Sequence, residues 1–323
     1  MKIAIVGAGA IGGYLGVKLA LAGCEVTFVA RGDNLAAIAE RGMKLLLPDG
    51  TALQTEGARA SSIEAAGPHD YVFLTMKAHQ VAPVAATIDG LCHERTRIVT
   101  LQNGLPWWYF YQLPGAHENA QLQSVDPGGL LWQRIRPERV IGAVVYPAAE
   151  LIAPGVVQLI EGNRFTLGEP GGEKSAATAA LAQAMMAAGF KTPVSSDIRS
   201  ELWVKLWGNL TFNPVSALTH ATLEQICSFA PTRSLAERMM AEAQAVGERL
   251  GVRFKVSIAQ RIDGAQAVGA HKTSMLQDLE QGKALELEAL LGSVIELGQI
   301  TGQPTPTLET VYALTKLLAQ QVA

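Results

Sequence analysis

Short apolar runs alternate with longer helical patterns along the first half of the chain. The runs, rich in β-branched residues, are KIAIVGA, EVTFVAR, YVFLTMK, RIVTLQNG and VIGAVVYP, between Lys2 and about Val145. Nearly continuous apolar runs separated by helical patterns are typical of βαβ units, in which both faces of a parallel sheet are covered. The pattern therefore predicts a doubly wound α/β domain at the N-terminus.

The stretch ELIAPGVVQLIEGNRFTLG, residues 150–168, has a different pattern. It predicts two or three antiparallel strands joined by turns at Pro154-Gly155 and Gly162-Asn163. We expect these strands to close the sheet.

The pattern changes again near residue 196. From there on, alanine, leucine, glutamate and glutamine dominate, the apolar spacing is helical, and strand signals nearly vanish. A chain of 323 residues is also long for a single hydrophobic core. We therefore expect an α/β domain over residues 1–196 and an all-helical domain over residues 197–323. Such a pair usually places its ligand beyond the carboxyl ends of the strands.

Composition bears on which partners the protein binds and on the cellular compartment in which it works. Lysine and arginine number 26 against 29 aspartates and glutamates, without a basic block, so we expect no nucleic-acid partner. The widely spaced Cys24, Cys92 and Cys227 fit a reducing cytosol. MKIAIVGAGAIGG leaves no room for a signal peptide, and no apolar stretch is long enough to span a bilayer. These features predict a cytoplasmic protein without a membrane partner.

A G-x-G-x-x-G motif follows the first predicted strand and opens a helical pattern. This context is that of a dinucleotide-binding fold of the Rossmann type. The first glycine permits a tight turn, the second lets a pyrophosphate approach the backbone, and the third lets the helix pack close to the sheet. The alternative is a glycine-rich turn without a nucleotide. The residues expected to hold the cofactor are Gly7, Ala8, Gly9, Ala10, Ile11 and Gly12.

Two basic residues at strand ends favour NADP(H). Arg31 ends the second predicted strand, where NAD enzymes of this fold place an acid on the ribose 2′-hydroxyl. A guanidinium suits a 2′-phosphate because it is a planar, permanently charged, bidentate donor. Asp33 lies close by and keeps NAD(H) open. Lys77 ends the strand YVFLTMK and offers a second cofactor contact, or is a solvated lysine.

The segment KLWGNLTFNP places three polar residues in an otherwise apolar helix. Lys205, Asn209 and Asn213 fall within an arc of about 80°. Buried polar groups without partners cost about 1–3 kcal/mol each, so this stripe needs a polar ligand to face. Alternatively, Lys205 reaches solvent and the asparagines cap nearby backbone. Pro214 biases Asn213 away from helical geometry.

Several segments together resemble the ketopantoate reductase family. They are GAGAIGG with Arg31, Lys77 in TMKAHQ, Asn103 in LQNG, KLWGNLTFNP and SMLQDLEQGKALELE. The resemblance covers essentially the whole chain. It implies an NADP-dependent oxidoreductase that reduces a branched 2-oxo acid, 2-dehydropantoate, to the 2-hydroxy acid pantoate, as in pantothenate biosynthesis.

The resemblance also implies roles for six residues of the second half and of the LQNG segment. Lys205 and Glu286 would be catalytic, the lysine near the substrate carbonyl and the acid near the reacting oxygen. Asn209 and Asn213 would contact the substrate. Asn103 would lie at the junction of cofactor and substrate, and Ser274 would bind a carboxylate or hydroxyl of the substrate.

The residues themselves bear on two of these roles. Ser274 followed by Gln277 is also a capping box for the helix MLQDLEQ, so its role stays open between capping and ligand binding. On a helix from Ala284 onward, Glu286 aligns with apolar positions and points inward. Glu288 falls on a polar face and is expected to be solvated.

Two departures from the family put the substrate in doubt. LPWWYFY follows LQNG, where small or acidic residues are common, and Gln158 stands where a histidine is frequent. Trp107, Trp108 and Tyr109 either wall the substrate, pack under the loop, or form a contact within a homodimer. The alternatives are therefore a paralogue that reduces another 2-oxo acid and a non-catalytic NADP(H)-binding sensor. The six histidines show no metal spacing, so no metal is expected.

Overall fold

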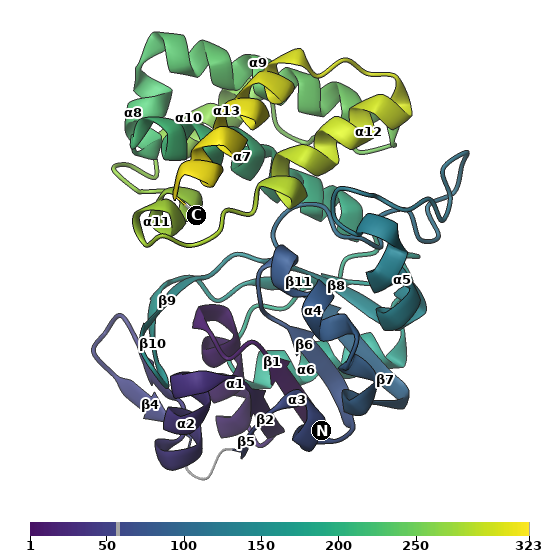
Figure 1. Cartoon of the computed structure of the whole chain (residues 1–323), viewed down its shortest axis with the longest axis vertical. Coiled ribbons are helices and arrows are strands. Elements are labelled where there is room, and N and C mark those ends of the chain that lie inside the picture. Colours follow the sequence, from purple (N-terminus) through teal and green to yellow (C-terminus); the bar gives the residue numbers. More distant parts are fainter. Residues whose placement is uncertain (56–58, 323) are drawn as a thin grey trace. The chain divides into compact units, whose positions relative to one another are not determined.

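The structure, a computed structural model, describes residues 1–55 and 59–322 and divides the chain into two compact units (Figure 1). Unit 1 consists of Met1–Gln102, Trp107–Gln121 and Gly128–Ile198, and unit 2 consists of Asn103–Pro106, Leu122–Pro127 and Arg199–Ala323. The last division falls between Ile198 and Arg199. Two short segments before this division nevertheless group with the helical unit. A single boundary in the sequence therefore cannot separate the two units.

The main sheet of unit 1 confirms the predicted α/β architecture. Its order is β11-β8-β7-β6-β1-β2-β5, and every neighbouring pair is parallel except β11 with β8. The five predicted runs form β1, β2, β6, β7 and β8. The strands are β1 (Lys2–Val6), β2 (Glu25–Val29), β5 (Arg59–Ser61), β6 (His69–Leu74), β7 (Cys92–Thr100), β8 (Val140–Val145) and β11 (Phe165–Gly168).

A second sheet was not expected. Strands β3 (Lys44–Leu46), β4 (Ala52–Gln54), β9 (Ala148–Ala153) and β10 (Val156–Glu161) form it in the order β4-β3-β10-β9. The expectation that residues 150–168 close the main sheet is therefore right only for β11. The reason lies in β10, whose Val157 and Leu159 are buried while its Gln158 is exposed. A strand with one apolar face needs its own partner surface, and helix α1 (Ala10–Leu21) provides it where Gly13 approaches Val157.

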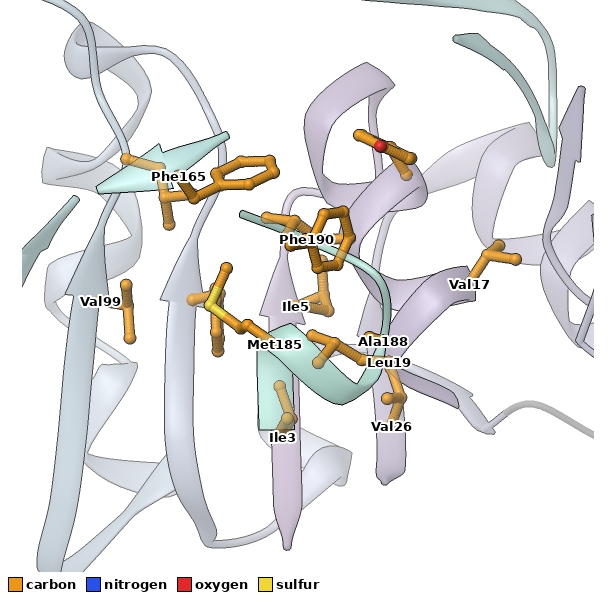
Figure 2. Packing of buried hydrophobic residues seen from close by; sticks show 14 of the residues in the cluster. Ile3, Ile5, Val17, Leu19, Val26, Val99, Phe165, Met185, Ala188 and Phe190 are labelled. Atoms are coloured by element: carbon orange, nitrogen blue, oxygen red, sulfur yellow. The ribbon is translucent and has the colours of Figure 1, made fainter. Parts of the chain in front are cut away.

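Apolar residues bury both faces of the main sheet. Ile3 and Ile5 join a cluster with Leu19 of α1 and Met185 of α6 (Ala176–Ala187), which lie over the strands in Figure 2. The intervening Ala4 and Val6 point to the opposite face and are also buried, because successive strand side chains alternate. Helices α3, α4 and α5 lie on that face (Figure 1). The other helical segments of unit 1 are α2 (Gly32–Arg41), α3 (Ile63–Ala66), Ala78–Gln80, α4 (Ala82–Ala85), Ile88–Leu91, α5 (Leu130–Ile135) and Pro137–Arg139.

Unit 2 is helical and is organised around α7 (Ile198–Thr219). Its Trp207 is 1% exposed, donates from Nε1 to the Met240 carbonyl at 2.8 Å, and packs with its ring on Phe254. The helix continues through Pro214, so the expected bias of Asn213 away from helical geometry is wrong. The other helices are α8 (Leu223–Ser228), α9 (Ala230–Arg249), α10 (Ile258–Gln266), α11 (Ser274–Glu280), a π-helix (Glu288–Gly292), α12 (Ser293–Thr301) and α13 (Pro306–Val322).

Candidate active site

Three polar side chains from distant parts of the chain meet within unit 2. Lys205 Nζ donates a hydrogen bond to Asn103 Oδ1 at 2.6 Å, and Asn103 Nδ2 donates to Glu286 Oε2 at 3.3 Å. The amide of Asn103 thus links an ammonium group to a carboxylate. We call Lys205, Asn103 and Glu286 the polar triad.

Backbone contacts hold Asn103 in place. The next residue, Gly104, has φ of +87°, and a Cβ there would overlap the carbonyl group of Ala289. Leu105 N donates to the same Ala289 carbonyl at 2.9 Å. Ala289 belongs to the π-helix that begins two residues after Glu286. The π-helix therefore fixes Asn103 and Glu286 relative to each other, which agrees with the tendency of π-helical turns to occur at functional sites.

Burial determines the protonation behaviour of Lys205. Loss of water around the ammonium lowers the pKa of Lys205 to about 8, and the negative charge of Glu286 opposes part of this shift. The side chain therefore switches between a proton donor and a neutral amine near physiological pH. A general acid works best when its pKa lies near the working pH.

The side-chain amides of the two asparagines on the α7 stripe lack a partner among the described residues. Asn213 is 7% exposed and Asn209 is partly buried. Within residues 1–55 and 59–322, no hydrogen bond reaches either side-chain amide. Buried amides are normally hydrogen-bonded, so both are available to a ligand.

Ser274 is the first residue of α11 and is exposed. The expected capping box on Ser274 is wrong, because the cap is Thr273, whose Oγ1 accepts from Leu276 N at 3.3 Å. Ser274 makes no side-chain hydrogen bond in the described part of the chain.

The helix expected from Ala284 starts later than predicted. Glu286 precedes the first helical residue, Leu287, and residues 288–292 are π-helical. The face argument for Glu286 thus assumed the wrong geometry. Glu288 lies on another side and accepts from Tyr312 Oη at 2.8 Å, with its side chain 46% exposed.

In unit 1, the glycine motif has the expected close contacts. Gly7 has φ of +101°, and a Cβ at Gly12 would overlap the Gly7 carbonyl and Thr75 Oγ1. Gly9 precedes α1, whose first amides have no intrahelical partner and attract anions. Ala8 is buried and Ala10 and Ile11 are partly buried. This loop has the form of a pyrophosphate cradle.

One residue that positions the cradle escaped prediction. Asn34 Nδ2 donates to the Ala8 carbonyl at 2.6 Å, and Asn34 Oδ1 accepts from Gly155 N at 2.8 Å. It ties the glycine loop to the turn between β9 and β10. Asn34 stands in the same VARGDN stretch as Arg31, but only the fold reveals both of its partners.

The basic residues at the strand ends have different surroundings. Arg31 is exposed and immediately precedes α2, and its side chain makes no hydrogen bond or ion pair within residues 1–55 and 59–322. Asp33 lies in the first turn of α2. Lys77 is partly buried and precedes the 3₁₀ helix Ala78–Gln80.

The aromatic segment after LQNG packs inside unit 1. Trp107, Trp108 and Tyr109 are 5%, 1% and 0% exposed. Trp108 Nε1 donates to Thr100 Oγ1 at 3.0 Å, and the Trp107 ring meets the Trp132 ring edge-on at 6.3 Å. These contacts favour packing over a substrate wall. Gln158, the other departure, is exposed on β10.

The described residues contain no cluster of three or more His, Cys, Asp or Glu side chains suited to a metal ion. They also contain no helix that is both long and apolar enough to cross a membrane.

Comparisons with known proteins cover the chain from end to end. Residues 3–172 match the family described as ketopantoate reductase PanE/ApbA, and residues 197–319 match its C-terminal counterpart. The 2-dehydropantoate 2-reductase of Mesorhizobium japonicum is 53% identical over 320 residues, covering 99% of this chain and 98% of that protein.

Solved structures share the fold. A provisionally assigned ketopantoate reductase from Ralstonia solanacearum MolK2 has a TM-score of 0.94 and 40% identity, with coverage of 99% of this chain and 98% of that chain. D-mandelate dehydrogenase bound to NADH and anilino(oxo)acetate has a TM-score of 0.84 and 21% identity, with coverage of 100% and 99%. At that identity the second likeness concerns the fold alone.

Proposed function

Because this chain belongs to the ketopantoate reductase family, we propose that it reduces 2-dehydropantoate to pantoate with a nicotinamide dinucleotide. The polar triad is the observation that carries the proposal. It offers an ammonium group, with a pKa of about 8, as the proton donor that a carbonyl reduction requires.

The polar triad and the two asparagines of α7 have distinct roles in the proposed reaction. When bound, the reduced nicotinamide supplies a hydride to the carbonyl carbon of the substrate. Lys205 donates its proton to the carbonyl oxygen, which stabilises the developing alkoxide. Asn103 orients the ammonium group, and Glu286 favours its charged form. The neutral amine left after transfer regains a proton from water. Asn209 and Asn213 offer their amides to the hydroxyl and carboxylate groups of the substrate.

The function is tested by following oxidation of reduced cofactor with 2-dehydropantoate, 2-oxoisovalerate and other 2-oxo acids. Preference for another 2-oxo acid would identify a paralogue. Tight cofactor binding without turnover of any 2-oxo acid would favour the sensor. The polar triad argues against a sensor, since cofactor binding alone does not require a lysine with a lowered pKa.

The cofactor is proposed to be NADP(H), held by residues 7–12 with Arg31 on the 2′-phosphate. Lys77 adds a second contact. The close approach at Gly12 and the exposed guanidinium of Arg31 support this choice. A cytoplasmic homodimer without a nucleic-acid partner stays a prediction.

Arg31→Ala should remove most of the preference for NADPH over NADH. A lost charge-assisted hydrogen bond costs on the order of 1.5–3 kcal/mol, or roughly tenfold to a hundredfold in affinity. The measurement is the dissociation constant of each cofactor by calorimetry. Arg41→Ala, at the far end of the same helix, serves as the control and should keep the preference. Equal affinities for both cofactors in the parent would refute the assignment.

A further inference from the structure

An arginine outside the predicted site packs against α7. A Cβ added to Gly208 would overlap the guanidinium group of Arg261, which comes from α10. The absence of a side chain at position 208 therefore makes room for that guanidinium against the helix backbone. Gly208 is three residues after Lys205 and one before Asn209. At 100° per residue, it lies about 60° around the helix from Lys205, beside the polar stripe.

No anion pairs with this guanidinium in the part of the chain that the structure describes. Across residues 1–55 and 59–322, the side chain of Arg261 makes neither a hydrogen bond nor an ion pair. It is partly buried, and this burial lowers the pKa of Arg261 while the neighbouring Cys227 opposes the shift. An unpaired charge removed from water is unfavourable, so such groups are usually paired or bind a ligand.

A nearby arginine shows the contrast. Arg233 on α9 donates from Nη2 to Asp263 at 2.7 Å and lies 3.6 Å from Glu237. Both Arg233 and Arg261 influence the same thiol, that of Cys227. Among the described residues of unit 2, two acids therefore pair with Arg233 and none pairs with Arg261, the arginine that approaches α7.

We propose that Arg261 binds the carboxylate of the 2-oxo acid substrate. The inference rests on the proposed function and assigns a specificity residue to it. In a 2-oxo acid the carboxylate is bonded directly to the carbonyl carbon, so a group that binds it must lie beside the one that faces the carbonyl oxygen. Lys205 takes the carbonyl oxygen, and Arg261 approaches the same helix beside it. A guanidinium matches a carboxylate with two parallel hydrogen bonds.

The test measures how well the protein distinguishes a charged ligand from a neutral one. Calorimetry with saturating oxidised cofactor, which allows no turnover, gives the affinities for 2-oxoisovalerate and for its neutral amide. The parent should prefer the acid, and Arg261→Gln should reduce the ratio of the two affinities roughly tenfold to a hundredfold. A residue that served packing alone would weaken both ligands equally and leave the ratio unchanged.

Two further variants complete the design. Arg233→Gln removes a paired arginine from the same unit and should keep the parent ratio. Gly208→Ala should reduce the ratio while Arg261 is retained, because the new methyl group displaces the guanidinium, and alanine suits the helix. If Arg261→Gln does not fold, Gly208→Ala decides the matter.

The outcomes separate this inference from the proposed function. If Arg261→Gln keeps the acid-to-amide affinity ratio of the parent, the proposed role of Arg261 is overturned. If Arg261→Gln does not fold, an unchanged ratio in Gly208→Ala overturns it instead. An Arg261-dependent preference for the acid, in a parent that turns over no 2-oxo acid, overturns only the proposed reductase activity. A parent that binds neither ligand overturns both.

Discussion

Lys205→Ala is expected to lower turnover of the 2-oxo acid by about 10²–10⁴-fold, the usual contribution of a positioned general acid. The variant removes both the proposed proton donor and the positive charge proposed to stabilise the alkoxide. Affinity for the reduced cofactor should stay close to that of the parent, because the glycine loop and Arg31 belong to unit 1. Steady-state kinetics give the first quantity and calorimetry gives the second.

Lys316→Ala is the matched control for this prediction. Lys316 is also a lysine of unit 2 hydrogen-bonded to a glutamate, since its Nζ lies 3.1 Å from Glu288 Oε1, but its side chain is 50% exposed. Its loss should leave turnover unchanged. Turnover of Lys205→Ala within a few-fold of the parent would mean that the lysine only completes the packing of α7.

Above about pH 8, kcat/KM for the 2-oxo acid should fall about tenfold per pH unit, and below pH 8 it should be level. Burial disfavours the ammonium form and brings the pKa of Lys205 down to about 8. The proton-donating ammonium form is therefore fully populated at lower pH and is lost as the pH rises through that value. The measurement is a pH profile of kcat/KM, which reports ionisations of the free enzyme.

Glu286→Gln should move this fall to lower pH. The carboxylate of Glu286 raises the pKa of Lys205, so removing its charge lets burial act unopposed. Glu288→Gln alters the neighbouring carboxylate, which contacts Tyr312 and Lys316, and should leave the profile in place. A profile that Glu286→Gln does not shift would show that the titrating group is not Lys205.

The sequence predicted the parallel sheet well because its central strands are buried on both faces and read as unbroken apolar runs. It missed β3 and β4, which are three residues long and only partly buried, so their pattern is too short to recognise. It also placed β9 and β10 in the wrong sheet. Strand pairing depends on which apolar surface lies nearby, and here that surface is α1.

The candidate site was less predictable than the fold. The stripe on α7 follows from helical spacing, but the roles of Asn103 and Glu286 came from the family resemblance. Their meeting depends on a π-helix, which the 3.6-residue period does not predict. The cap at Thr273 differs by one residue from the expected one. The sequence pattern did not predict a role for Arg261, because a single arginine on a polar helix face normally reaches solvent.

The helical unit is built from segments that are not contiguous in the sequence. Asn103–Pro106 groups with the helical unit, although it directly follows Gln102 of unit 1. A gene fragment that began at Arg199 would encode every helix of unit 2 from α8 onward yet lack the amide that joins Lys205 to Glu286. The helical unit therefore cannot be exchanged as a single uninterrupted segment. Recombination between relatives has to transfer Asn103–Pro106 together with the helices.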